Sequence, residues 1–134
     1  MAVDSSLAGR TFAPTAAYVV SAERIAEFAA ATGCAYDGGA APATFPIVVA
    51  FRAMTDLLDD PSVGISLHRV VHGEQRFTHH RPLTAGDAVI GTLHVDAVRE
   101  AGGHAMVTTR TELATEAGEP VCTATSTIVI RGGE

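Results

Sequence analysis

Asp37 and a set of histidines are the side chains of this 134-residue chain that could take part in acid–base chemistry. Asp37 is followed by Gly38 and Gly39. Its carboxylate could act as a base or nucleophile, but an aspartate beside glycines more often forms a turn. All six histidines lie in the second half of the chain, beginning at His68. His72 is the second candidate for chemistry, with a structural role on a strand as the alternative.

The two cysteines, Cys34 and Cys122, are too few for a disulfide framework and form no Cys-X-X-Cys pair. Their spacing to the histidines does not match a zinc site, so we expect no metal and no cofactor. A chain with so few cysteines is typical of a reducing compartment, and we expect a cytoplasmic protein.

Charge and hydropathy exclude further classes. The net charge of −6 disfavours a nucleic-acid partner, because an acidic chain repels phosphates. There is no uninterrupted apolar run of the length that spans a bilayer, so we expect no membrane segment. The opening MAVDSSLAGR lacks the basic and apolar regions of a secretion signal.

The first half of the chain predicts one short strand and two helices. A strand at Tyr18–Val20 leads to Ser21, which can cap a helix that carries one apolar face and ends at Gly33. A connection rich in glycine and alanine, Cys34–Ala43, follows. Thr44 then caps a second helix, Phe45–Leu58, which is apolar almost all round and is therefore expected to be buried.

The second half alternates with a period of two, which is typical of strands. Gly73 interrupts the first of them and predicts a bulge. The expected strand segments are Ser66–His72, Glu74–His80, Ala88–Arg99, His104–Thr115 and Pro120–Arg131. Tight turns between the long strands predict an antiparallel meander.

These elements predict one α+β domain over residues 1–134, with an antiparallel sheet wrapped around a long buried central helix. Such a sheet leaves an edge strand unpaired, which proteins rarely leave open. We therefore expect two sheets to join edge to edge in a dimer.

Two motifs in the strand region resemble those of the MaoC-like hydratases and dehydratases, a family with the hot-dog fold. Arg69–Phe77 (RVVHGEQRF) resembles a motif of actinobacterial members related to the substrate-binding subunit of (3R)-hydroxyacyl-ACP dehydratases, and Arg81–Asp87 (RPLTAGD) resembles the family's RPL-x-AGD turn. Ala41–Phe45 and Gly9–Phe12 are similar to the entry into the central helix and to the N-terminal opening. The resemblance covers nearly the whole chain.

The resemblance implies chemistry on acyl thioesters carried by coenzyme A or acyl carrier protein, with the acyl chain beside the central helix at a dimer interface. It also implies a catalytic Asp and His five residues apart in the loop before that helix. In this chain the residue five after Asp37 is Pro42. The loop is also shorter than the resemblance implies, as if its catalytic part were deleted.

The resemblance further implies that backbone N–H groups at the start of the central helix face the thioester oxygen. The expected substrate-binding residues are Ala43, Thr44, Phe45 and Val48. His79 and His80, beside Arg81, could contact an acidic carrier or a phosphate, or could form a solvated face.

The missing histidine predicts a non-catalytic subunit of a dehydratase or hydratase, inactive alone and paired with a MaoC-like chain that carries the Asp–His dyad. The alternatives are a stand-alone hydratase or thioesterase that uses Asp37 or His72, and a homodimer that binds acyl thioesters without chemistry. Acyl length, carrier and pathway, whether fatty-acid or polyketide, stay open.

Overall fold

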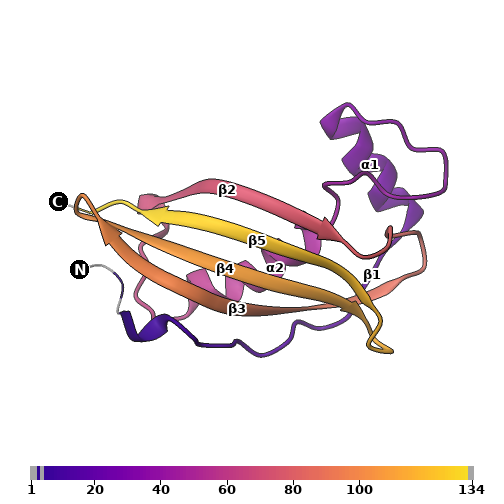
Figure 1. Ribbon diagram of the computed structural model, residues 1–134. Coiled ribbons are helices and arrows are strands. Elements are labelled where there is room, and N and C mark those ends of the chain that lie inside the picture. Colours follow the sequence, from indigo (N-terminus) through magenta and orange to yellow (C-terminus); the bar gives the residue numbers. More distant parts are fainter. Residues whose placement is uncertain (1–2, 4, 133–134) are drawn as a thin grey trace.

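The computed structural model describes Val3 and residues 5–132. In that part, an N-terminal strand and helix precede a central helix and four long strands (Figure 1). The elements are η1 Ser5–Leu7, β1 Tyr18–Val19, α1 Ala22–Thr32, α2 Ile47–Asp59, η2 Leu67–Arg69, β2 Val70–His79, β3 Ala88–Ala101, β4 His104–Thr115 and β5 Pro120–Ile130.

The strands form one antiparallel sheet in the order β1-β3-β4-β5-β2. The β3–β4 hairpin turns at Gly102 and Gly103, whose φ angles of 60° and 82° suit the tight turn that the sequence predicts. A register shift between His72 and Glu74 confirms the bulge predicted at Gly73. The α+β class and the antiparallel meander are therefore confirmed.

Helix α1 begins and ends as predicted. The Ser21 hydroxyl accepts a hydrogen bond from the Arg24 N–H at 3.1 Å, and Gly33 closes the helix with a φ of 74°. Both ends are thereby satisfied by local groups.

Two predicted boundaries are wrong. Helix α2 begins at Ile47 after Pro46, and the Thr44 side chain does not cap it. The residues before it form a tight turn instead, in which the Phe45 N–H donates to Pro42 C=O at 2.9 Å. The segment before Val70 is a 3-10 turn rather than strand, because Val70 already pairs with Ile130, the last residue of β5.

Helix α2 packs against the concave side of the sheet, mainly over β3 and β4. The residues that face the sheet are buried: Val49, Ala50, Ala53, Met54 and Leu57. The sequence predicted that this helix is buried all round. For a single chain that prediction is wrong, because Phe51, which points away from the sheet, is 50% exposed. No helix among the described residues has both the length and the hydropathy needed to cross a bilayer.

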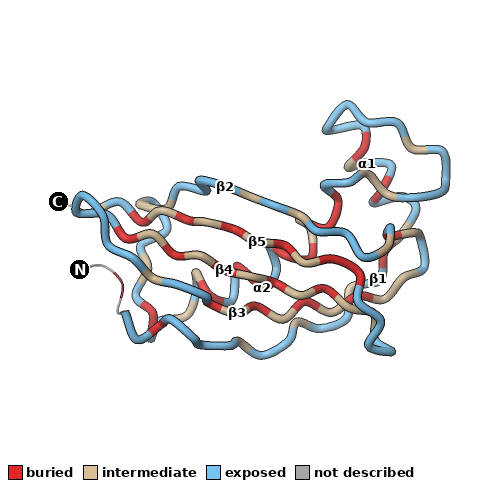
Figure 2. The backbone as a smooth tube through the Cα atoms, in the orientation of Figure 1, coloured by how far each residue is buried: buried red, intermediate tan, exposed pale blue. Residues whose placement is uncertain are grey.

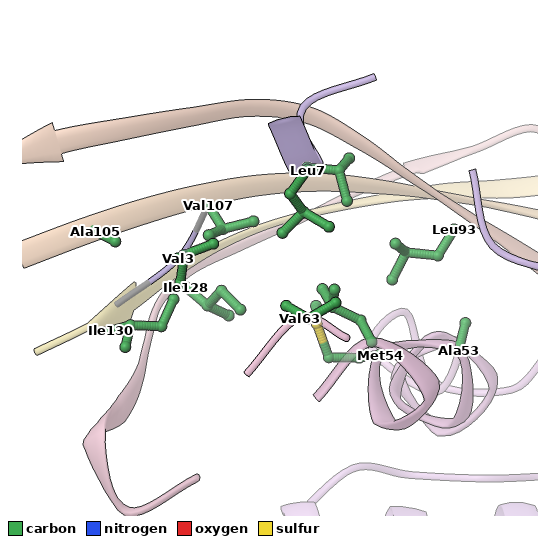
Figure 3. Close-up of a cluster of buried hydrophobic side chains, with 12 residues drawn as sticks. Val3, Leu7, Ala53, Met54, Val63, Leu93, Ala105, Val107, Ile128 and Ile130 are labelled. Carbon is green, nitrogen blue, oxygen red and sulfur yellow. The ribbon is translucent and has the colours of Figure 1, made fainter. Parts of the chain in front are cut away.

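The apolar core consists of two clusters. One joins Ala53, Met54 and Leu57 to the β3–β4 hairpin end of the sheet (Figure 3). The other joins Phe45, Val49 and Ala50 to the opposite end and to Ile25 of α1. Three buried polar residues of β4 and β5 belong to neither cluster: Thr109, Thr111 and Ser126.

The two edges of the sheet differ. The N-terminal segment runs along β3 and covers it, with hydrogen bonds from the N–H groups of Gly9, Phe12 and Thr15 to β3 carbonyls at 2.8 to 2.9 Å (Figure 1). No described segment pairs with the outer side of β2, whose residues are mostly exposed (Figure 2). β2 is therefore the open edge that the sequence led us to expect.

Candidate functional site

Asp37 lies in an exposed turn of the connection before α2. Its Oδ1 accepts a hydrogen bond from the Gly39 N–H at 3.0 Å, and Gly38 between them has a φ of 96°. This is the turn-forming arrangement that the sequence allowed for. Among the described residues no hydrogen bond or ion pair joins Asp37 to a histidine.

His72 lies on β2 and is exposed. Its Nε2 lies 3.0 Å from Gln75 Oε1, and the same oxygen accepts the Ser126 hydroxyl. His72 therefore bonds a side chain rather than a backbone group, at the end of a polar network that leads into the sheet. The structure does not bring this network and Asp37 together through any described bond.

The start of α2 has a hollow on either side. A cavity of about 430 Å³ is lined by Ala41, Pro42, Ala43 and Pro46 on one wall and by residues 79–83 on the other. A smaller hollow of about 260 Å³ is lined by Phe45 and Val48 together with residues of α1 and Tyr18. Of the four predicted substrate-binding residues, Ala43 therefore lines the larger hollow, whereas Phe45 and Val48 line the smaller.

The larger cavity has one apolar wall, formed by prolines and alanines. The exposed His79 and His80 belong to the opposite wall. The Phe45 N–H is already bonded to Pro42, so it is not free to meet a thioester oxygen. Phe45 itself is 1% exposed and packs edge-on against Phe28, with the ring centroids 5.3 Å apart.

Arg81 is fixed within its own turn. Its guanidinium donates to both Asp87 carboxylate oxygens at 3.0 and 3.2 Å and pairs with Glu119 at 3.1 Å. The hydrogen bonds from Arg81, joined by one from the Thr84 N–H, hold the pKa of Asp87 below its usual value. With its charge already paired, Arg81 stabilises the turn and has little left to offer a phosphate.

Gln75, Ser126 and Thr109 are site candidates that our sequence reasoning missed. Ser126 pairs with Gln75 on β2 and with Thr109 on β4, so the three lie in one row across the sheet. The signal was present in the sequence, because Thr109 and Ser126 occupy inward positions of strands where apolar residues otherwise alternate.

Sequence comparisons place the chain in a family. Residues 6–124 match the family model described as FAS1-like, dehydratase domain region. UPF0336 proteins of Saccharopolyspora erythraea and Streptomyces coelicolor are 41% and 38% identical, over 98% and 100% of this chain and 94% and 99% of their own. The first alignment spans 146 positions against 134 residues here, so at least 12 positions have no residue in this chain.

Solved structures share the fold. A chain of the truncated HadBC complex, a (3R)-hydroxyacyl-ACP dehydratase of Mycobacterium tuberculosis, matches with a TM-score of 0.82 at 28% identity, over 96% of this chain and 99% of that one. A MaoC-like dehydratase matches with a TM-score of 0.79 at 25% identity, over 96% of this chain and 43% of its own. HtdX of M. tuberculosis, at 22% identity and a TM-score of 0.80, supports the fold alone; the match covers 91% of this chain and 51% of HtdX.

The fold and these matches define a hot-dog domain of the MaoC-like dehydratase type. The chain belongs to the family of FAS1-like dehydratase domain regions. The resemblance predicted from the two strand motifs is thereby confirmed.

Proposed function

We propose that this chain is the non-catalytic, substrate-binding or stabilising subunit of a (3R)-hydroxyacyl-thioester dehydratase or enoyl hydratase. A second MaoC-like chain supplies the acid and base, and the pair acts on acyl groups carried by acyl carrier protein or coenzyme A, in the cytoplasm, during fatty-acid or polyketide processing. The observation that carries the proposal is that Asp37 is held in a turn within a loop that contains no histidine.

Dehydration beside a thioester needs a base for the α-proton and an acid for the leaving hydroxyl. The loop Cys34–Ala43 offers one exposed carboxylate and no imidazole. A deletion in this loop is part of the proposal, and it would account for the aligned positions that are missing from this chain relative to the UPF0336 proteins.

The open edge of β2 suits the attachment of a second hot-dog domain. The His80 N–H donates to Val121 C=O of β5 at 2.8 Å. Because backbone groups alternate sides along an antiparallel strand, the N–H and C=O groups of Phe77 and His79 point to the open edge. Phe51 and Val71 are 50% and 46% exposed. A partner that covers them would remove this apolar surface from water, which favours association.

The matched structures support such a pairing. HadBC is named as a complex of two chains, and HtdX has about as much chain again beyond its matched half. In each case the matched domain is part of a larger complex or chain.

A homodimer is the second candidate arrangement, and the charges of β2 favour it. Glu74 and Arg76 flank Gln75 on the outer face and pair with each other at 2.8 Å. In an antiparallel pairing of two copies centred on Gln75, each Glu74 would lie opposite the Arg76 of the other copy. Opposite charges facing each other across strands are stabilising.

Co-expression tests the subunit proposal. We expect the full chain to co-purify with a MaoC-like chain of the same genome that carries the Asp–His pair. Hydration of crotonyl-CoA and of longer enoyl-CoA thioesters should require both chains.

The single chains and the variants Asp37→Ala and His72→Ala are the controls, and both variant complexes should keep their activity. A stable homodimer that gains neither a partner nor activity would overturn the subunit role. Turnover by this chain alone, lost in either variant, would instead establish the stand-alone enzyme.

A further inference from the structure

A row of polar side chains crosses the helix-facing side of the sheet, between the two apolar clusters. Gln75 of β2, Ser126 of β5 and Thr109 of β4 are successive cross-strand neighbours, with His72 bonded to Gln75 at the open edge. Ser126 is 4% exposed and Thr109 is fully buried. The row therefore runs from the surface into the centre of the core.

Hydrogen bonding along the row is incomplete at its buried end. Gln75 Oε1 accepts from both His72 and Ser126, and one Gln75 amide N–H donates to Arg76 C=O at 3.2 Å. Thr109 Oγ1 has no hydrogen-bond partner in the structure, although it is buried. Leaving a buried hydroxyl unpaired costs free energy, so the groups in the row are poised to bond something else.

The row ends at β2, the edge of the sheet opposite β1. Arg52 stacks on Tyr18, which belongs to β1 at the opposite edge, with 4.7 Å between the guanidinium carbon and the ring centroid. At 3.6 residues per turn, Phe51 lies on the other flank of the stripe that packs on the sheet. Exposed Phe51 thus lies on the flank of α2 away from Tyr18, and half-buried Phe77 and Gln75 lie on the helix-facing side of β2.

We propose that this row binds an uncharged oxygen, a hydroxyl or keto group, carried by an acyl chain lying along α2, and so selects oxygenated chains over all-methylene ones. This inference rests on the proposed function, because it is the proposed function that places an acyl chain in the protein. The row lies level with the step from Ala50 to Ala53, where one apolar cluster ends and the other begins. That step lies about 5–9 Å along the helix from Ile47, so the recognised oxygen is several carbons beyond the one whose hydroxyl is eliminated.

The available groups determine the kind of ligand. Thr109 and Ser126 are closed to solvent in the free chain, so α2 must move away from the sheet for a ligand oxygen to reach them. An oxygen above Ser126 would then lie between Thr109 and Gln75, each one strand away. The Thr109 hydroxyl and the second Gln75 amide N–H can donate to it, and Ser126 can accept. No described residue of the row carries a permanent charge, so a carboxylate or an ammonium group would be desolvated without a counter-charge.

Binding of matched thioesters to the full chain tests the inference. The probes are 10-hydroxydodecanoyl-CoA and dodecanoyl-CoA, and their affinities for the chain are measured by calorimetry. We expect the hydroxylated chain to bind about tenfold more tightly, as for one or two buried hydrogen bonds. Thr109→Val and Ser126→Ala should bring this ratio close to one and leave dodecanoyl-CoA binding within about twofold.

Thr108→Val is the matched control, because residue 108 lies on the outer face of the same strand, and the ratio should stay as in the parent chain. Should Ser126→Ala fail to fold, the nearly isosteric Thr109→Val decides. Equal affinity of the parent chain for both thioesters, or an equal loss for both in the variants, overturns the inference and leaves the subunit proposal standing. Binding of neither thioester overturns both.

Discussion

The Arg81–Asp87 turn and the row formed by Gln75, Ser126 and Thr109 are two polar clusters that differ in how completely their hydrogen-bonding groups are paired. In the turn, Arg81 and Asp87 bond each other and Thr84 within seven residues of sequence. In the row, partners come from three strands and Thr109 Oγ1 has none. A cluster that satisfies itself stabilises the fold, whereas one that leaves a buried group unpaired is a candidate for binding a ligand.

The largest expected effect comes from removing the centre of the turn. Asp87→Ala would leave the Arg81 guanidinium with the exposed Glu119 as its one carboxylate partner, beside its bond to the Pro82 carbonyl. The Thr84 N–H would lose its acceptor. We expect a loss of about 2–3 kcal/mol in the free energy of unfolding, measured by urea denaturation.

Glu74→Ala provides the contrast, because its pair with Arg76 is solvent-exposed on both sides. Such pairs contribute less than about 1 kcal/mol. If both variants lost the same small amount, the turn would not be the stabilising cluster that its geometry indicates.

Acid should weaken the turn in a defined direction. Hydrogen bonds from Arg81 hold the pKa of Asp87 below its usual value of 3.8. A depressed carboxyl pKa stabilises the fold above the unfolded-state value, and this contribution is lost as pH falls through the folded-state value.

The free energy of unfolding should therefore drop below about pH 5, and more steeply in the parent chain than in Asp87→Asn. Asp60, whose pKa is lowered chiefly by hydrogen bonds that it accepts from Ser62, keeps part of the slope in both proteins. Parallel acid profiles for the two proteins would show that Asp87 is not linked to stability.

The same two clusters show how far the sequence could be interpreted. The RPLTAGD segment predicted its turn because the residues that hold it together are neighbours in sequence. Ser21, Gly33 and Gly73 also acted locally and were identified correctly. Thr44 was wrongly assigned as a helix cap. The chain forms a turn there instead, in which the Phe45 N–H is bonded to the Pro42 carbonyl.

The row escaped prediction because its members are brought together by strand register. Gln75 and Ser126 are 51 residues apart and meet only when β2 pairs with β5. The alternation marks Thr109 and Ser126 as inward polar residues, but it does not show that they lie beside each other or beside Gln75. Similarly, the exposure of Phe51 depends on which strands α2 covers, and the apolar composition of the helix does not contain that information.

The smallest expected effect distinguishes the row from the turn most directly. Thr109→Val replaces an unpaired buried hydroxyl by a methyl group of similar size, so no hydrogen bond is lost in the free protein. We expect the free energy of unfolding to rise by about 1 kcal/mol, whereas Thr108→Val on the outer face should stay within about 0.5 kcal/mol of the parent. A clear loss of stability in Thr109→Val would mean that the hydroxyl has a partner in solution, such as a buried water, and that the row is already satisfied without a ligand. A gain would mean that the chain retains a destabilising hydroxyl at the centre of its core, which is the pattern expected where a binding site has been kept at the expense of stability.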